Sequence, residues 1–158
     1  MRKFAAHYLV TDVGVFLKNG IALVGDDGFI VQYIDTTGDL KEIEQLTFYN
    51  GILMGGTQFT KTISTQTNRV TDNSFQKFVF QSVADSTQLS IENLIDLGKV
   101  LQLQFPEMKI PAILNEMSDV LLGEGGFIKE IIPGIYLLSK VDLVELKFTP
   151  KSWLKLII

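Results

Sequence analysis

The chain has 158 residues, of which 46% are hydrophobic, and its 14 basic and 18 acidic side chains give a formal net charge of −4. This length suits one domain and is too short for a complete (β/α)₈ barrel, which typically needs about 250 residues. The acidic balance argues against nucleic acid as a partner. The absence of cysteine excludes disulfide bonds, thiolate metal sites and a cysteine nucleophile.

No segment of the sequence suggests a membrane protein. The first apolar stretch is interrupted by His7 and then by Thr11-Asp12, so it lacks the apolar core of about 7 to 15 residues that a signal peptide needs. No run approaches the roughly 20 apolar residues of a membrane span. We therefore expect a soluble, cytoplasmic protein without a membrane partner, and the lack of cysteine fits that compartment.

The start of the chain predicts a β-meander. Residues 3–10 read as a strand, and Asn19-Gly20 offers the positive φ of a tight hairpin turn before a second strand at 21–24. Gly25-Asp26-Asp27-Gly28 predicts another hairpin turn, after which residues 29–34 return antiparallel.

The next part of the chain also favours strands. Residues 48–54 are strand-like, with Asn50-Gly51 as a turn or bulge inside them. The stretch 57–73 is rich in Thr, Gln, Asn and Ser, which favours an edge strand or a loop over a helix. Residues 75–80 are apolar enough to dock as a further strand.

Two amphipathic helices follow. Ser90 can cap the first helix, which ends at Phe105-Pro106. Pro111 suits the first turn of the second helix, which stops at Gly123. Their expected apolar faces consist of Ile91, Leu94, Ile95, Leu97, Val100, Leu101 and Leu103 in the first helix, and Ile113, Leu114, Met117, Val120 and Leu121 in the second.

After Gly125-Gly126 the pattern returns to strands. It predicts one strand at 127–132, a turn near Pro133-Gly134, a strand at 135–140 and a last apolar strand around 153–158. Neither these strands nor the N-terminal ones are numerous enough to bury an apolar face alone, so both sets should share one core.

The pattern as a whole predicts an α+β fold in a single domain, 1–158. Strands from 1–56 and 124–158 together build a β-sandwich, and 57–123 is an insert of strand and helices.

Short sequence motifs near both ends of the chain, called words below, resemble those of a known enzyme family. Residues 18–31, with Asn19-Gly20 and Asp27-Gly28, are similar to a hairpin of the form x-x-Gly-x-Val-x-Val followed by Asp-Gly-x-Ile. Residues 125–138 are similar to Gly-Ser-Phe-x-x-Gly-Lys-x-Pro-Gly-Ile-x-Leu-Leu. Both words are typical of the amidohydrolase superfamily, in its deaminase and chlorohydrolase-like branch. The resemblance implies a composite β-sandwich built from both chain ends, with two helices as the remnant of a truncated barrel.

The resemblance also implies that the family's metal site is lost. Residues 48–63 resemble the family's Asn-Gly-Ile-Leu-Val-Pro-Gly and the His-x-His that follows it, but those histidines fall at Lys61 and Ile63. An ammonium has no lone pair to donate, and isoleucine has no donor atom. Asp85 matches a metal-binding aspartate of the family, but a single carboxylate does not make a zinc site. We therefore expect no metal site, no catalytic residues and no cofactor.

Other candidate residues have structural explanations. His7, the single histidine of the sequence, has no neighbouring base and is expected as a hydrogen-bonded or partly exposed strand residue. Gly51 and Gly55-Gly56 lack the Gly-Lys-Ser/Thr of a phosphate-binding loop and suit a turn or bulge. The aromatic residues of the 75–80 stretch could stack on a ligand but fit a core better: Phe75, Phe78 and Phe80.

Two functions remain open at this point. The first is a non-catalytic interaction or structural module, a pseudoenzyme that forms a homodimer. Helices deprived of barrel strands would expose apolar residues that a second copy could cover, namely Leu97, Leu101, Ile113 and Met117. The second is a small-molecule binder or residual hydrolase acting on C–N bonds at a rebuilt site, served by Asp85 and a metal supplied across a dimer. The sequence does not indicate the identity of the small molecule.

Overall fold

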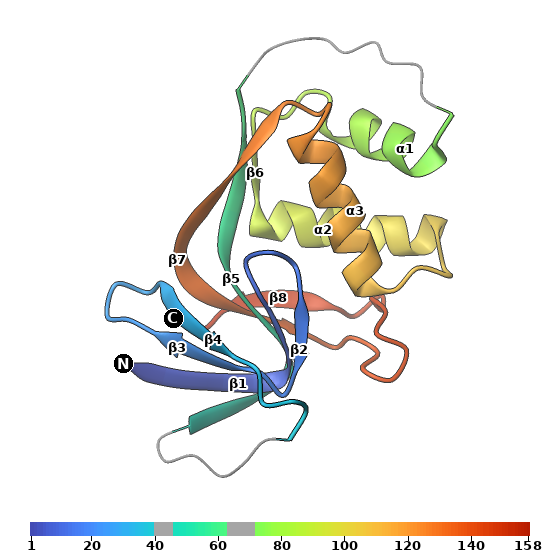
Figure 1. Ribbon diagram of the computed structural model, residues 1–158. Helices are drawn as coiled ribbons and strands as arrows, with labels where there is room; N and C mark the ends of the chain where they lie inside the picture. The colour runs from blue at the N-terminus through green and yellow to red at the C-terminus, as the bar shows by residue number, and fades with distance from the viewer. Residues whose placement is uncertain (40–45, 63–71) are drawn as a thin grey trace. The chain divides into compact units, whose positions relative to one another are not determined.

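The computed structural model describes residues 1–39, 46–62 and 72–158, which form an α+β fold with three helices and a multi-stranded sheet (Figure 1). Part of the Thr-rich stretch belongs to a strand, as expected, and residues 63–71 of that stretch lie outside the described residues. None of the described helices has the length and apolar character needed to cross a membrane.

The chain divides into two compact units. The first comprises Met1–Gly56 together with Ile131–Ile158, and the second comprises Thr57–Glu130. Strand β5 (Leu46–Lys61) and strand β7 (Phe127–Ser139) each contribute residues to both units.

The first hairpin of the first unit is made by one long strand and two short ones. Strand β1 (Arg2–Val10) pairs antiparallel with β2 (Phe16–Lys18) and with β3 (Ile21–Val24). The hairpin turn is closed by the Thr11 N–H, which donates to the Val15 carbonyl oxygen at 2.9 Å.

The predicted hairpin turn at Asn19-Gly20 is wrong. Tyr8 faces Lys18 and Ala5 faces Ile21, so the register along β1 is the same on both sides of Asn19. Asn19 does have a positive φ of 52°, but its N–H donates to the His7 carbonyl oxygen at 2.9 Å within the same ladder. The Asn-Gly pair therefore interrupts one continuous strand and does not reverse the chain.

The second predicted hairpin is confirmed. Strand β4 (Ile30–Ile34) pairs antiparallel with β3. Gly28 has a φ of 85°, which glycine adopts readily, and its N–H donates to the Gly25 carbonyl oxygen across the turn.

The bulge predicted at Asn50-Gly51 is also confirmed. Strand β5 runs parallel to β1, and the register shifts so that Asn50 and Gly51 together face His7. Gly51 has a φ of 143°, and a side chain there would collide with the Leu138 carbonyl oxygen of β7. Glycine is therefore required at this point of the sheet.

The predicted turn at Pro133-Gly134 is wrong, because β7 continues through it. Gly134 has a φ of 123°, and its N–H donates to the Gly28 carbonyl oxygen at 3.0 Å instead of closing a turn. Strand β8 (Trp153–Leu156) pairs antiparallel with the end of β7.

Strands from both chain ends belong to the same sheet. The order is β4-β3-β1-β5-β7-β8, with β2 alongside β1. One buried cluster in the first unit combines N-terminal, central and C-terminal residues: Phe4, Ala6, Leu9, Ala22, Val24, Leu53, Ile135 and Leu137. Ile30 and Tyr33 of β4 pack against this cluster, and so do Ile157 and Ile158 after β8.

Both predicted helices are confirmed in the second unit. Helix α2 (Ile91–Gln104) starts at Ser90, whose hydroxyl accepts from the Asn93 N–H in a capping box that follows strand β6 (Gln88–Ser90). Helix α3 (Ile110–Leu122) has proline in its first turn and ends at Gly123.

The strand predicted at 75–80 is wrong. These residues belong to helix α1 (Ser74–Val83), in which the Asn73 side chain caps the Gln76 N–H. The buried side chains are Phe75, Val79 and Val83, which recur every four residues on one helical face.

The helical residues expected to be exposed are mostly buried. Leu101, Ile113 and Met117 are inaccessible or nearly so, and Leu97 is half-buried. The reason is that the helices of the second unit pack against one another: α2 contacts α3, and α3 also contacts α1, which was not predicted. The expectation of an exposed helical face is therefore wrong for these three residues.

Candidate functional site

Lys61 is held in place at the end of β5. Its backbone N–H donates to the Thr87 carbonyl oxygen at 2.8 Å, and its Nζ lies 5.9 Å from the centroid of the Phe127 ring. Phe127 is buried, so the ammonium has an aromatic face beside it. Ile63, the other position of the lost His-x-His, lies outside the described residues.

Asp85 lies in the turn that follows α1 and is exposed. Among the described residues, no group of three histidine, aspartate or glutamate side chains converges in a way that could hold a metal ion.

His7 is a hydrogen-bonded strand residue, as predicted. Its Nδ1 accepts from the Gly51 N–H at 3.3 Å, and its ring packs edge-on against Phe48 with the ring centroids 5.2 Å apart. This bond requires a lone pair on Nδ1, so the proton of the neutral ring belongs on Nε2. His7 therefore stabilises the bulge of β5 through its hydrogen bond with Gly51.

Sequence reasoning missed a row of polar side chains in the second unit. The Gln88 Nε2 donates to the Gln58 Oε1 at 2.9 Å, and the Gln58 Nε2 donates to the Glu130 Oε2 at 2.7 Å. The row links β6, β5 and β7 through side chains whose pairing depends on strand register. No local sequence pattern indicates it.

A groove lies between α1 and α3 in the second unit. It has a volume of about 350 Å³, within the usual size range of small-molecule pockets. Its lining consists of aromatic, amide, acidic and aliphatic residues: Asn73, Phe75, Gln76, Phe80, Glu116, Asp119, Val120, Gly123 and Glu124.

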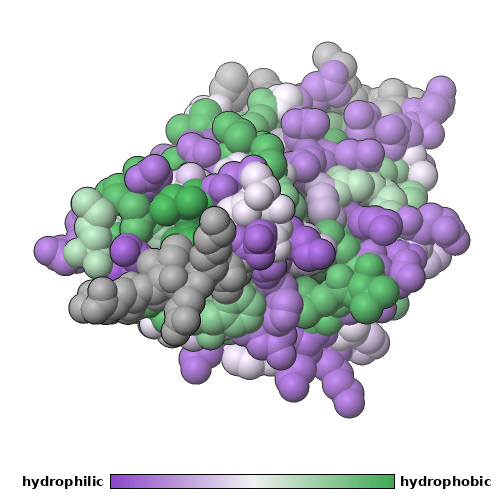
Figure 2. Space-filling model, turned by 60° about the horizontal axis from the view of Figure 1, so that its bottom comes forward, coloured by the Kyte–Doolittle hydropathy of each residue, from purple (hydrophilic) through white to green (hydrophobic). Residues whose placement is uncertain are grey.

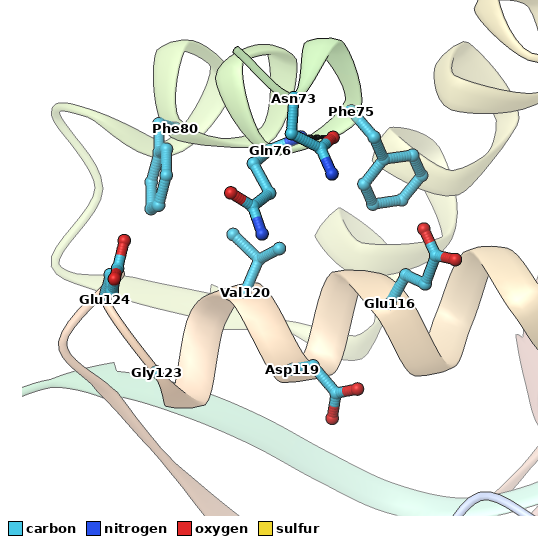
Figure 3. A pocket seen from close by; sticks show the side chains of 9 residues that line it. All are labelled: Asn73, Phe75, Gln76, Phe80, Glu116, Asp119, Val120, Gly123 and Glu124. Atoms are coloured by element: carbon cyan, nitrogen blue, oxygen red, sulfur yellow. Dashed lines mark hydrogen bonds between the residues drawn. The ribbon is translucent and has the colours of Figure 1, made fainter. Parts of the chain in front are cut away.

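Figure 3 shows how these side chains lie. Gln76 extends from α1 toward Val120 on α3, and Phe80 faces Glu124 at one end of the groove. Asp119 points away from the space between the helices. A carboxylate and an aromatic ring at one end of a groove are groups that attract a small organic cation.

Two aromatic residues of α1 line the groove, and one of them also belongs to the core. Phe75 is buried and contacts Phe105, with the ring centroids 5.4 Å apart, which confirms its predicted core role. Phe80 is half-buried and lines the groove. The strand predicted at 75–80 does not give these positions. A strand places Phe78 and Phe80 on one face because its side chains repeat every two residues, whereas a helix places them on different faces.

Among the described residues, Tyr33 has a clearly raised pKa. Burial raises the pKa of its phenol above the ordinary value of 10.0, and the Asp12 carboxylate raises it further. A hydrogen bond from the Asp12 backbone N–H lowers it in part. Tyr33 packs against the core of the first unit, which explains its desolvation.

Comparison with protein-family models, with characterised proteins and with solved structures finds no match to this chain.

Proposed function

We propose that this chain is a non-catalytic, amidohydrolase-like protein that acts as an interaction module. In this proposal the strands of both chain ends form the family's composite β-sandwich, and the helices are the remnant of its barrel. The shared cluster of Phe4, Leu53 and Ile135 supports the first part, because it draws on both ends of the chain. The cytoplasm is the proposed location, and no cofactor is required.

The observation that carries the proposal is the position of Lys61. The resemblance places a metal-binding histidine there, and the residue present is a cation that lies over the Phe127 ring. A positive charge at this point repels a divalent cation, and the ring stabilises the ammonium where it is. The contact of Lys61 with Phe127 at the end of β5 therefore supports a structural role for this position.

Metal content and turnover test the proposal directly. We expect purified protein to contain no stoichiometric zinc or iron, and its melting temperature to be unchanged by EDTA or by added zinc. We also expect no turnover of a panel of amidine and ring-amine substrates. One equivalent of tightly bound metal that disappears in Asp85→Asn would contradict the proposal, as would turnover that Asp85→Asn abolishes.

The groove between α1 and α3 favours a second candidate, a small-molecule binder. Phe80 and Glu124 face one another there, and Gln76 could orient a polar group. Titration with benzylamine and with benzyl alcohol, followed by backbone amide NMR shifts, separates this candidate from the first. Saturable shifts of α1 and α3 amides with the amine alone, lost in Phe80→Ala and in Glu124→Gln, would support it. Asp96→Asn is the matched control, since Asp96 is an exposed residue of α2 that does not line the groove.

A further inference from the structure

Exposed apolar side chains occur singly in both units. Val144, in the loop before β8, is 89% exposed, and Leu103 on α2 is 75% exposed. Figure 2 shows one face of the molecule, on which hydrophobic residues form separate patches among hydrophilic ones. Single exposed apolar residues are usual on protein surfaces and do not by themselves indicate a ligand. The groove between α1 and α3 differs from them, because it is a cavity that combines aromatic rings with charged groups.

The groove is negatively charged. Its described lining contains three carboxylates, those of Glu116, Asp119 and Glu124, and no lysine or arginine. Helix α3 carries no basic side chain, and Lys77 of α1 is exposed and does not line the groove. Carboxylates gathered in a concave site raise the local concentration of cations. The charge of the groove therefore favours a positively charged ligand.

The aromatic rings and two of the carboxylates lie at separate ends of the groove. Figure 3 shows Phe80 and Glu124 at one end and Phe75 and Glu116 at the other. Glu116 precedes the end of α3 at Leu122 by nearly two helical turns, a rise of about 9 Å. Glu124 follows Leu122, so the groove has two negative ends that are about 10 Å apart. A carboxylate and an aromatic ring at each end attract a cation there.

The middle of the groove suits an aliphatic chain. Val120 lies on α3 between the two glutamates and is buried, and Gln76 extends from α1 toward it. Methylene groups that leave water for such a surface gain free energy through the hydrophobic effect. The volume of about 350 Å³ is near the lower end of the range for small-molecule pockets, which favours a slender ligand.

The distance between the two ends argues for an extended ligand. A divalent metal ion needs several ligands that converge, and no group of histidine, aspartate and glutamate among the described residues does so. A ligand with one ammonium group can use only one end. A chain with an ammonium group at each terminus can use both, because the second contact then forms within the complex at a high effective concentration.

We propose that the groove between α1 and α3 binds an extended aliphatic dication, a linear diamine or polyamine. One ammonium group binds at the end formed by Phe80 and Glu124, and another binds at the end formed by Phe75 and Glu116. This inference rests on the second candidate in the proposed function, the small-molecule binder, and names the class of its ligand.

Isothermal titration calorimetry with three amines tests the two-ended contact. The probes are octamethylenediamine, octylamine with one ammonium group on a chain of the same length, and trimethylenediamine with two ammonium groups on a chain too short to reach both ends. Low salt, about 50 mM NaCl, limits the screening of exposed charges. We expect octamethylenediamine to bind more than about tenfold more tightly than octylamine. Trimethylenediamine should bind no more tightly than octylamine, although it carries the same charge as the long diamine.

The variant Glu116→Gln separates the two-ended contact from a general attraction by charge. It removes the carboxylate of one end and should lower the affinity for octamethylenediamine to about that of octylamine. The matched control is Asp96→Asn, which removes the same charge from an exposed residue of α2 outside the groove and should preserve the advantage of the long diamine. Circular dichroism and thermal melting check that both variants fold. Backbone amide NMR shifts should place the long diamine on both α1 and α3.

Three results would overturn the proposal. They are equal affinities for octamethylenediamine and octylamine, a Glu116→Gln variant that keeps the advantage of the long diamine, and NMR shifts confined to residues outside α1 and α3. Binding of benzylamine and octylamine in the groove without any gain from a second ammonium group would overturn the dication and leave the small-molecule binder in place. No binding of any amine would contradict both.

Discussion

The two units bury their apolar side chains by different routes. In the first unit, the core joins Phe4, Leu53 and Ile135, which come from distant parts of the sequence and meet through the pairing of β1, β5 and β7. In the second unit, the core is made by helices that follow one another closely along the chain. The first unit therefore depends on long-range register, and the second depends on local helix signals and close packing.

The largest expected effect is at Gly51. Alanine there would place a side chain against the Leu138 carbonyl oxygen in a backbone conformation reserved for glycine, and we expect a loss of roughly 3 kcal/mol or more of unfolding free energy. Gly38→Ala is the matched control, because Gly38 also has a positive φ of 82° but an added Cβ would meet the Lys18 side chain only at an ordinary contact distance of 3.8 Å. That control should cost about 1 kcal/mol. Urea denaturation measures both.

Hydrogen exchange shows whether the effect of Gly51→Ala is confined to the long-range sheet. The comparison of the units predicts that amides of β1, β5 and β7 lose protection first, while those of α2 and α3 keep most of theirs. Equal loss in both groups would show that the two cores unfold together.

Removal of a buried aliphatic side chain tests the helical core. Ile113 is fully buried in α3, so Ile113→Ala should reduce the free energy of unfolding by about 2 to 5 kcal/mol. Leu103→Ala, at a residue of α2 that is 75% exposed, should change it by less than about 0.5 kcal/mol. If the two substitutions had similar effects, the helices would not form the core described here.

A smaller effect is expected at the cap of α2. Ser90→Ala removes the hydroxyl that accepts from the Asn93 N–H, which should cost about 1 kcal/mol. Ser82→Ala, in the exposed last turn of α1, should be close to neutral, because its hydroxyl bonds to the Phe78 carbonyl oxygen of its own helix. Thermal melting of both variants gives the comparison.

The smallest effect is a dependence on alkaline pH in the first unit. The raised pKa of Tyr33 means that its neutral phenol is favoured in the folded state. The corresponding stability is fully present below the ordinary pKa of 10.0 and is lost as the pH rises through the higher folded pKa. Tyr33→Phe should flatten the decline in unfolding free energy above pH 10.0, and an unchanged slope would assign the decline to other groups.

The surroundings of Lys61, at the position of the lost metal-binding histidine, show what the sequence does not predict. The sequence places Lys61 where the resemblance expects a histidine, but the contact of its Nζ with Phe127 depends on how β5 and β7 pair. The groove was not predicted, because it requires α1 to be a helix. Asn73 before an apolar residue was the available signal, since asparagine is a strong helix cap.

The sequence by itself determined the features that a few neighbouring residues control. The capping box at Ser90, proline at the start of α3, the turn at Gly28 and the bulge at Gly51 all depend on local backbone conformation and local hydrogen bonds. Only the tertiary structure decided that Asn19-Gly20 and Pro133-Gly134 lie within continuous strands. The physical reason is that a strand obtains its hydrogen bonds from another part of the chain, so its limits follow from its partner and its register.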